Sequence, residues 1–255
     1  MQAGFFSRRA ASDRKKPLNT FLTLTVGTTR AATYWAALLV RCRLGEGAAG
    51  KVGFKGSLHK TAVFLEAHPF GTVPAAFSPD GKVGIFESNS IMRAVARLGE
   101  SKFPLYGRGP YEAARVDSFL DASLVFARDA QHYLLGLMNG SVSAETHARA
   151  RDGFAAYAAG IDQALSSDRE YLVGETVTLA DICFAAELSL FFNDSHRTAA
   201  LEKEGLAPVL RRGFAARYPR AFAHFARLRE HPSFAPDLAP YLDKFEPALS
   251  AWIAA

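Results

Sequence analysis

Along the first hundred residues, the spacing of apolar positions changes repeatedly between a period of two and a period near 3.6. Residues 21–26 alternate threonine with apolar side chains, which predicts a strand. Residues 31–43 form an apolar helical run, and a weak second strand is predicted at 52–54. Residues 59–67 fit a short helix. The predicted order of these four segments is therefore strand, helix, strand, helix.

Two more apolar runs, residues 72–77 and 82–86, flank the segment Ser78-Pro79-Asp80-Gly81. Proline presets φ and glycine accepts a positive φ, so this segment is typical of a tight hairpin turn. Residues 88–98 then show helical periodicity. The whole pattern predicts a small α/β domain over residues 20–100.

Beyond residue 100 only helical periodicity is found. Residues 101–110 are rich in proline and glycine, which is typical of a linker. The predicted helices after it cover residues 111–138, 144–166, 178–192 and 218–230. We therefore expect an all-α domain over residues 111–255, ending in an apolar tail at 241–252 that packs back on the body. The predicted fold class is α+β with two domains.

The segment Thr178-Leu-Ala-Asp181 has the form of a helix capping box. The threonine hydroxyl accepts from the third helical amide, and the aspartate reaches back to the amide of the cap. Losing either partner would cost roughly 0.5–2 kcal/mol. We assign this motif to folding and not to catalysis.

Composition narrows the class of protein. The chain has 255 residues, 49% hydrophobic and 22% charged, as globular proteins do. No apolar stretch approaches the roughly 18 residues of a membrane span, so no membrane role is expected. Cys42 and Cys183 lie in apolar helical runs, which favours reduced, packed thiols and a cytoplasmic location. The histidines show no ligand spacing, so no metal is expected.

The net charge of +5 is concentrated at the start of the chain, where residues 1–16 carry five basic side chains against one acidic. Nucleic-acid binding needs basic residues along a folded face, and none is indicated, so no nucleic-acid partner is expected. Residues 1–19 are interpreted as a disordered basic arm. Arg8 and Arg9 among small residues also loosely resemble an organelle transit peptide.

Two segments carry the motifs of a known family. The first runs through His59-Lys60-Thr61, Pro69-Phe70-Gly71-Thr72-Val73-Pro74-Ala75 and Phe86-Glu87-Ser88-Asn89. The second is Tyr171-Leu-Val-Gly-Glu-Thr-Val-Thr178-Leu-Ala-Asp181. Together they resemble the cytosolic glutathione transferase superfamily, in which a thioredoxin-like domain precedes an all-helical one. Within it, Phe86-Glu87-Ser88-Asn89 looks most like the transferase-like domain of elongation factor one gamma, and His59-Lys60 looks like theta-type enzymes.

The resemblance implies a binding site for glutathione as co-substrate. Val73 would bind the cysteinyl unit through its main chain, which a cis Pro74 exposes. Glu87 and Ser88 would hold the γ-glutamyl group, since a carboxylate suits the ammonium and a helix N-terminus suits the carboxylate. His59 and Thr72 match positions near the glycyl end.

The resemblance also implies a homodimer, in which Asp117 reaches the γ-glutamyl group bound to the neighbouring subunit. The hydrophobic electrophile would lie between the domains, lined by Phe119, Leu124 and Phe126.

The group that activates the thiol is less evident. The segment between the first strand and the first helix holds no serine, tyrosine or cysteine. Thr28 and Thr29 are the candidate catalytic residues, because a hydroxyl hydrogen bond stabilises a thiolate. They could equally be helix caps without a catalytic role.

Two functions follow from the resemblance. The first is a glutathione transferase that adds the thiolate to an apolar, aromatic electrophile, with detoxification or the cleavage of an aryl ether as its role. The second is a non-catalytic interaction module like the domain of elongation factor one gamma.

Overall fold

The computed structural model describes residues 23–25, 62–72, 74–77, 82–98, 104–166, 169–210 and 213–245. The chain divides into two compact units, Met1–Phe103 and Pro104–Ala255. Over the described ranges, no helix combines the length and the apolar character needed to cross a membrane.

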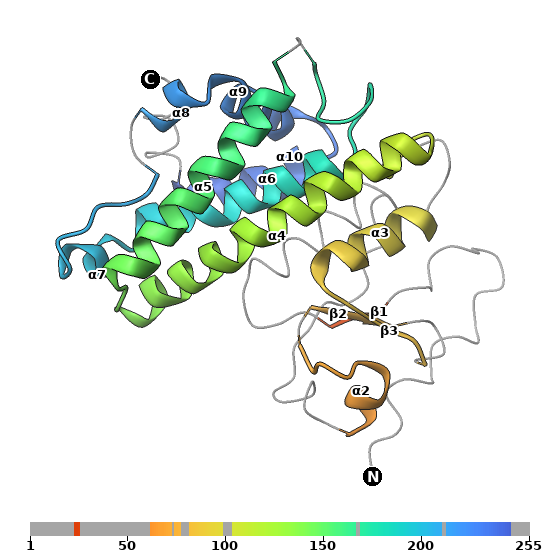
Figure 1. Ribbon diagram of the computed structural model, residues 1–255, viewed down its shortest axis with the longest axis horizontal. Coiled ribbons are helices and arrows are strands. Elements are labelled where there is room, and N and C mark those ends of the chain that lie inside the picture. Colours follow the sequence, from red (N-terminus) through yellow and green to blue (C-terminus); the bar gives the residue numbers. More distant parts are fainter. Residues whose placement is uncertain are drawn as a thin grey trace. The chain divides into compact units, whose positions relative to one another are not determined.

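Within the described residues, the first unit contains a three-stranded antiparallel sheet and two helices (Figure 1). The strands are β1 (Thr23–Thr25), β2 (Ala75–Phe77) and β3 (Gly84–Phe86), and β2 lies in the middle. The helices are α2 (Ala62–Ala67) and α3 (Ser88–Leu98). The predicted hairpin turn, the helix at 31–43 and the strand at 52–54 lie outside the described residues.

The side chains of β2 alternate between two small cores, one on each face of the sheet. Ala75 and Phe77 pack with Phe64 of α2. Ala76 points the other way and packs with Ile91 of α3. Because successive strand residues point to opposite faces, three buried residues in a row are enough to hold a helix on each side.

The second unit is all-helical. Its main helices are α4 (Pro110–Asn139), α5 (Ala144–Ala164), α6 (Leu179–Phe191) and α9 (Pro219–Glu230). They agree with the predicted helices to within a few residues at each end. The fold class predicted from the sequence, a thioredoxin-like domain followed by a helical one, is confirmed.

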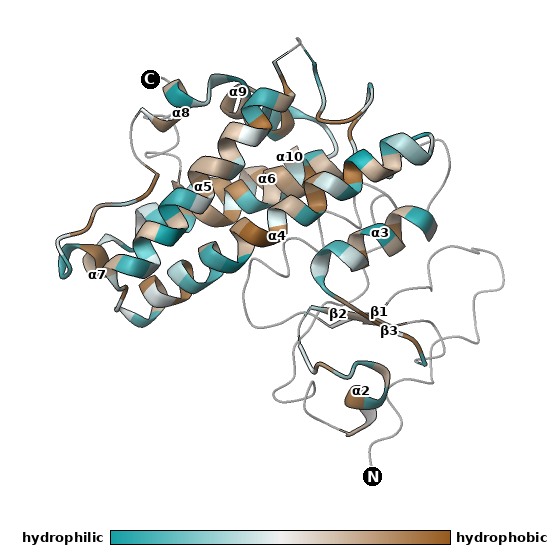
Figure 2. Cartoon of the chain, viewed as in Figure 1, coloured by the Kyte–Doolittle hydropathy of each residue, from teal (hydrophilic) through white to brown (hydrophobic). Residues whose placement is uncertain are grey.

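Helix α6 is the centre of the helical unit. Every residue from Leu179 to Ser189 is buried, because α4 and α9 pack against it. A helix that is mostly apolar and buried on all sides belongs in a core. Both apolar and hydrophilic positions run along α4 and α5, as expected of helices that border solvent (Figure 2).

Several short helices were not predicted. They are η2 (Phe192–His196), α7 (Thr198–Glu202), α8 (Phe214–Arg217), α10 (Ala235–Leu242) and η3 (Asp243–Phe245). Leu242 and Phe245 are fully buried, so the described start of the predicted apolar tail lies in the core. Residues 246–255 lie outside the described part of the chain.

Candidate functional site

One edge of the sheet brings together the ends of all three strands. Thr25, the last residue of β1, pairs with Ala75, the first residue of β2. Phe86, the last residue of β3, pairs with the same Ala75. Extending this register by one residue places Pro74 opposite Glu87. Two residues that the sequence assigns to glutathione thus meet at this sheet edge, next to the start of α3.

Glu87 has an unusual backbone. Its φ is 65°, whereas the other positive φ angles among the described residues belong to glycine. The left-handed conformation costs a residue with a side chain roughly 1–2 kcal/mol. Such strain persists where the surroundings impose it, often at binding sites. The carboxylate side chain of Glu87 is exposed.

The first turn of α3 follows directly. The Glu87 carbonyl accepts from the amide of Ile91 at 3.0 Å, which is the first helical bond of α3. The amides of Ser88, Asn89 and Ser90 therefore have no acceptor within the helix. With the helix dipole, such amides favour a nearby negative charge, and the first turn of α3 contains no acidic side chain.

Of the other predicted glutathione residues, Thr72 is described and exposed, two residues before Pro74. Its hydroxyl lies 3.4 Å from Nε2 of His68. Val73, His59, Thr28 and Thr29 lie outside the described residues. The sheet edge therefore unites Pro74, Glu87 and Ser88, with Thr72 close in sequence.

Asp117 lies on α4 and is half-buried. Its Oδ2 accepts a hydrogen bond from the Tyr106 hydroxyl at 2.5 Å. This bond ties α4 to the segment before it, inside the helical unit. A contact of Asp117 with a second subunit remains a prediction.

Two of the three residues predicted to line the site of the second substrate lie together. Phe119 and Phe126 line a groove of about 390 Å³ between α4 and α5, and Leu124 is not part of its lining. Phe126 is only 2% exposed and stacks on Tyr157 at 5.1 Å, so it also belongs to the core. Arg115 lies over the ring of Phe119, with its Cζ 4.9 Å from the ring centroid.

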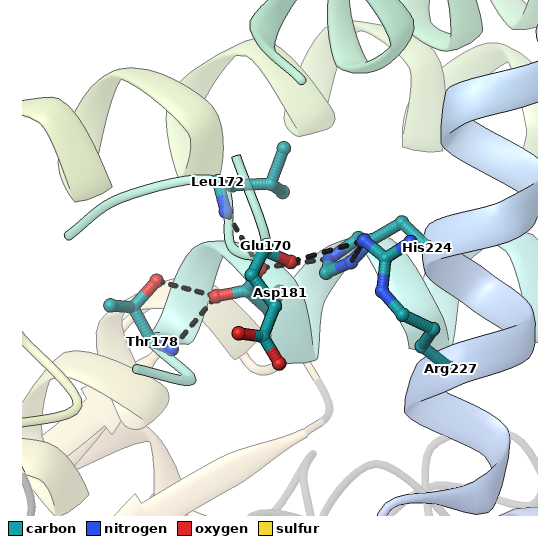
Figure 3. A network of polar contacts seen from close by, with 6 residues as sticks. All are labelled: Glu170, Leu172, Thr178, Asp181, His224 and Arg227. Atoms are coloured by element: carbon teal, nitrogen blue, oxygen red, sulfur yellow. Dashed lines mark hydrogen bonds and ion pairs between the residues drawn. The ribbon is translucent and has the colours of Figure 1, made fainter. Parts of the chain in front are cut away.

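A buried polar network lies at the start of α6 (Figure 3). The Asp181 carboxylate accepts from the amides of Leu172 and Thr178 at 2.9 and 2.8 Å. It also accepts from the Thr178 hydroxyl at 2.9 Å, and Nε2 of His224 lies 2.9 Å away. The predicted capping box is confirmed.

His224 was not predicted, because it joins this network from α9. Arg227 reaches Nδ1 of His224 at 3.3 Å and also donates to the Glu170 carbonyl at 3.2 Å. Arginine can only donate, so Nδ1 is the acceptor and Nε2 carries the proton given to Asp181. The carboxylate is saturated by its own chain, and its role is structural.

A second buried group, Glu187 of α6, has no such support. Burial raises the pKa of its carboxyl to about 8, so the side chain is neutral at pH 7. Burial also raises the pKa of the nearby Tyr157, helped by Cys183 and Glu187. The thiol of Cys183 is buried, and its Sγ donates to the Ser123 hydroxyl at 3.1 Å. Among the described residues, no group of His, Cys, Asp and Glu is arranged to hold a metal ion.

Comparison with known proteins gives both sequence relatives and structural neighbours. Residues 116–232 match the family described as glutathione S-transferase, C-terminal domain. The chain is 31% identical over 188 residues to a probable elongation factor 1-gamma 1 of Arabidopsis thaliana, a match over 70% of this chain and 39% of that protein. It is 32% identical over 130 residues to glutathione S-transferase F9 of the same plant, covering 49% of this chain and 60% of the relative.

Two solved structures illustrate the fold. Ure2p in complex with glutathione aligns with a TM-score of 0.65 at 17% identity, over 88% of this chain and all of that one. A monomeric glutathione S-transferase of the hookworm Necator americanus aligns with a TM-score of 0.62 at 20% identity, over 86% of this chain and 97% of the other. The chain thus spans the full length of such folds but well under half of the elongation factor relative.

Proposed function

Because the chain belongs to the cytosolic glutathione transferase superfamily, we propose that it binds glutathione at the sheet edge and adds its thiolate to an apolar electrophile. The observation that carries this proposal is the left-handed Glu87, opposite Pro74 and directly before α3. An exposed carboxylate on a residue with a strained backbone, beside a helix N-terminus, matches a ligand end that carries both an ammonium and a carboxylate.

The contacts follow from charge and hydrogen-bonding capacity. The γ-glutamyl carboxylate accepts from the first amides of α3 and from the Ser88 hydroxyl. The exposed Glu87 carboxylate accepts from the ammonium of the same group. The main chain of Val73 binds the cysteinyl unit, and Thr72 and His59 contact the glycyl end.

The sulfur of glutathione then has to ionise. A thiol with an ordinary pKa near 8.5 is mostly protonated at pH 7 and needs a lowering of about one to two units. Thr28 and Thr29 come soon after β1, whose end lies at the sheet edge, and a threonine hydroxyl donating to sulfur stabilises the thiolate. The thiolate forms a carbon–sulfur bond and expels the leaving group as an anion.

A second candidate function is supported by the relatives. The match to the probable elongation factor 1-gamma 1 of Arabidopsis thaliana extends over 70% of the chain, whereas the match to the transferase F9 covers 49%. In this alternative the chain keeps the fold and the dimer, and its surface binds a partner chain without turnover. Both candidates act in the cytoplasm.

The test combines binding with turnover. Glutathione at about 100 times its dissociation constant should raise the unfolding free energy by about 2.7 kcal/mol. A chlorinated dinitrobenzene serves as the generic electrophile, and the Thr28→Ala, Thr29→Ala double variant should lose on the order of 10-fold or more in kcat/KM while still binding glutathione.

The outcomes separate the candidates. Stabilisation without turnover supports the interaction module, and an unchanged rate in the double variant removes the threonine mechanism. No stabilisation at millimolar glutathione overturns the binding proposal itself. Sedimentation of the native protein tests the homodimer, with a monomer at micromolar concentration contradicting it.

A further inference from the structure

His68 follows the last residue of α2 and is fully buried. Its imidazole stacks on Phe64, with the ring centroids 5.2 Å apart and the planes 25° apart. On β3, the ring of Phe86 packs against the same imidazole, with the ring centroids 4.9 Å apart. Phe86 directly precedes Glu87, so His68 packs against the residue that leads into the sheet edge.

The backbone around His68 is closely fitted to β3. The His68 carbonyl accepts from the Gly71 amide at 3.1 Å, closing a tight turn in which Gly71 has a φ of 55°. On the opposite side, a Cβ at Gly84 would lie 2.1 Å from the Ala67 carbonyl oxygen. The turn that leads to Thr72 therefore packs closely against β3, and this packing fixes the turn relative to the strand.

The polar atoms of His68 are poorly suited to so apolar a place. Nδ1 is buried and has no hydrogen-bond partner among the described residues. An unsatisfied buried polar atom destabilises the fold, and a phenyl ring in the same position would avoid that cost. The polar contact that the imidazole makes is Nε2 to the Thr72 hydroxyl, at 3.4 Å.

We propose that His68 is a positioning residue of the glutathione site, which holds the Thr72 hydroxyl toward the ligand while its ring supports Phe86 beneath Glu87. This inference rests on the proposed function. The positioning role explains why this residue is a histidine, because packing against Phe64 and Phe86 requires only a ring and not Nε2. His68 itself touches no substrate, because it is fully buried.

A double-mutant cycle on the full chain tests the link. Glutathione affinity is measured by calorimetry for the wild type, His68→Phe, Thr72→Val and the double variant. His68→Phe keeps a ring between Phe64 and Phe86 but loses Nε2. Each single variant should bind glutathione about three- to tenfold more weakly, as the loss of one hydrogen bond predicts. The double variant should be no weaker than the weaker single variant.

Two controls separate positioning from folding. Thr72→Ser keeps the hydroxyl and should bind almost as the wild type does. His132→Phe replaces an exposed histidine on α4 and should leave affinity unchanged. In turnover, His68→Phe should raise the KM for glutathione and leave kcat unchanged, which a general loss of folded protein would not do. If His68→Phe does not fold, His68→Leu, which likewise has no hydrogen-bonding atom in its side chain, replaces it in the cycle.

Wild-type affinity in the His68 variant, or losses that multiply in the double variant, would overturn the positioning role while leaving the proposed function intact. A wild type that does not bind glutathione overturns both.

Discussion

Asp181 and Glu87 are both carboxylates next to the start of a helix, yet they are held in opposite ways. Asp181 is fully buried, and its carboxylate accepts hydrogen bonds from Leu172, Thr178 and His224. Glu87 is exposed, has a strained backbone, and makes no side-chain hydrogen bond within the described residues. A carboxylate whose oxygens all accept hydrogen bonds from its own chain stabilises the fold. A carboxylate on a strained backbone, whose oxygens accept none of these bonds, is suited to binding a ligand.

Two other buried carboxylates of the helical unit, those of Asp162 and Asp194, also accept hydrogen bonds from backbone amides. Asp162, near the end of α5, accepts from the amides of Arg220 and Ala221 at 2.8 and 3.1 Å and thereby caps α9. Asp194 accepts from the Leu210 amide at 2.8 Å and from the Tyr133 hydroxyl. The buried aspartates Asp162, Asp181 and Asp194 thus join segments that are far apart in sequence.

The largest expected effect is the loss of the saturated carboxylate. Asp181→Ala should lower the free energy of unfolding by roughly 3–5 kcal/mol, because buried donors from three residues lose their acceptor. Urea denaturation measures the change. As a control, Asp152→Ala removes an exposed carboxylate paired with Arg151 and should change the stability far less, because solvent screens this ion pair. Equal effects of the two substitutions would contradict the structural role of Asp181.

Glu187 should make stability depend on pH. Its folded pKa is about 8, above the usual 4.5, so the folded state keeps a proton that the unfolded state releases between these values. The stabilising effect of the neutral carboxyl is complete below pH 4.5 and is lost as pH rises toward 8. The loss should reach up to about 4 kcal/mol.

Glu187→Gln provides the control for this pH dependence. An amide does not titrate, so the variant should show a flatter profile and exceed the wild type in stability at pH 8. Denaturation at a series of pH values measures both proteins. Parallel profiles would contradict the assignment to Glu187.

The smallest expected effect on stability has the opposite sign. Glu87→Gly relieves the left-handed strain and should stabilise the protein without glutathione by about 0.5–1 kcal/mol. The same change removes the carboxylate and should weaken glutathione binding about tenfold or more. Glu87→Gln keeps the strained backbone and loses only the charge, so it should weaken binding without stabilising the protein. Thermal unfolding and calorimetry measure the two effects.

The sequence predicted what short-range patterns control. Helix α3 has the predicted bounds, Ser88–Leu98, because its periodicity is strong and a strand ends just before it. The capping box of α6 was also predicted, since both partners lie within four residues. Helix α10 was not, because Pro236 and Pro240 interrupt its pattern, and Pro240 lies inside the helix.

Contacts between residues far apart in the chain could not be predicted from the sequence. His224 is 43 residues from Asp181, and no local pattern links them. The contact of Asp117 with Tyr106 was missed for the same reason, since it depends on how the segment before α4 turns back. Glu87 and Ser88 were named from motifs, but the positive φ that distinguishes Glu87 depends on the surrounding structure.

The most direct test of the account follows the backbone amides by NMR while glutathione is added to the full chain. We predict the largest shift changes at Glu87, Ser88 and Asn89, with smaller ones at Ala75 across the sheet edge. The chemical shifts of the amides around Asp181 in the helical unit should not change. Unchanged amides at the start of α3 under millimolar glutathione, or changes confined to the helical unit, would contradict a glutathione site at this edge.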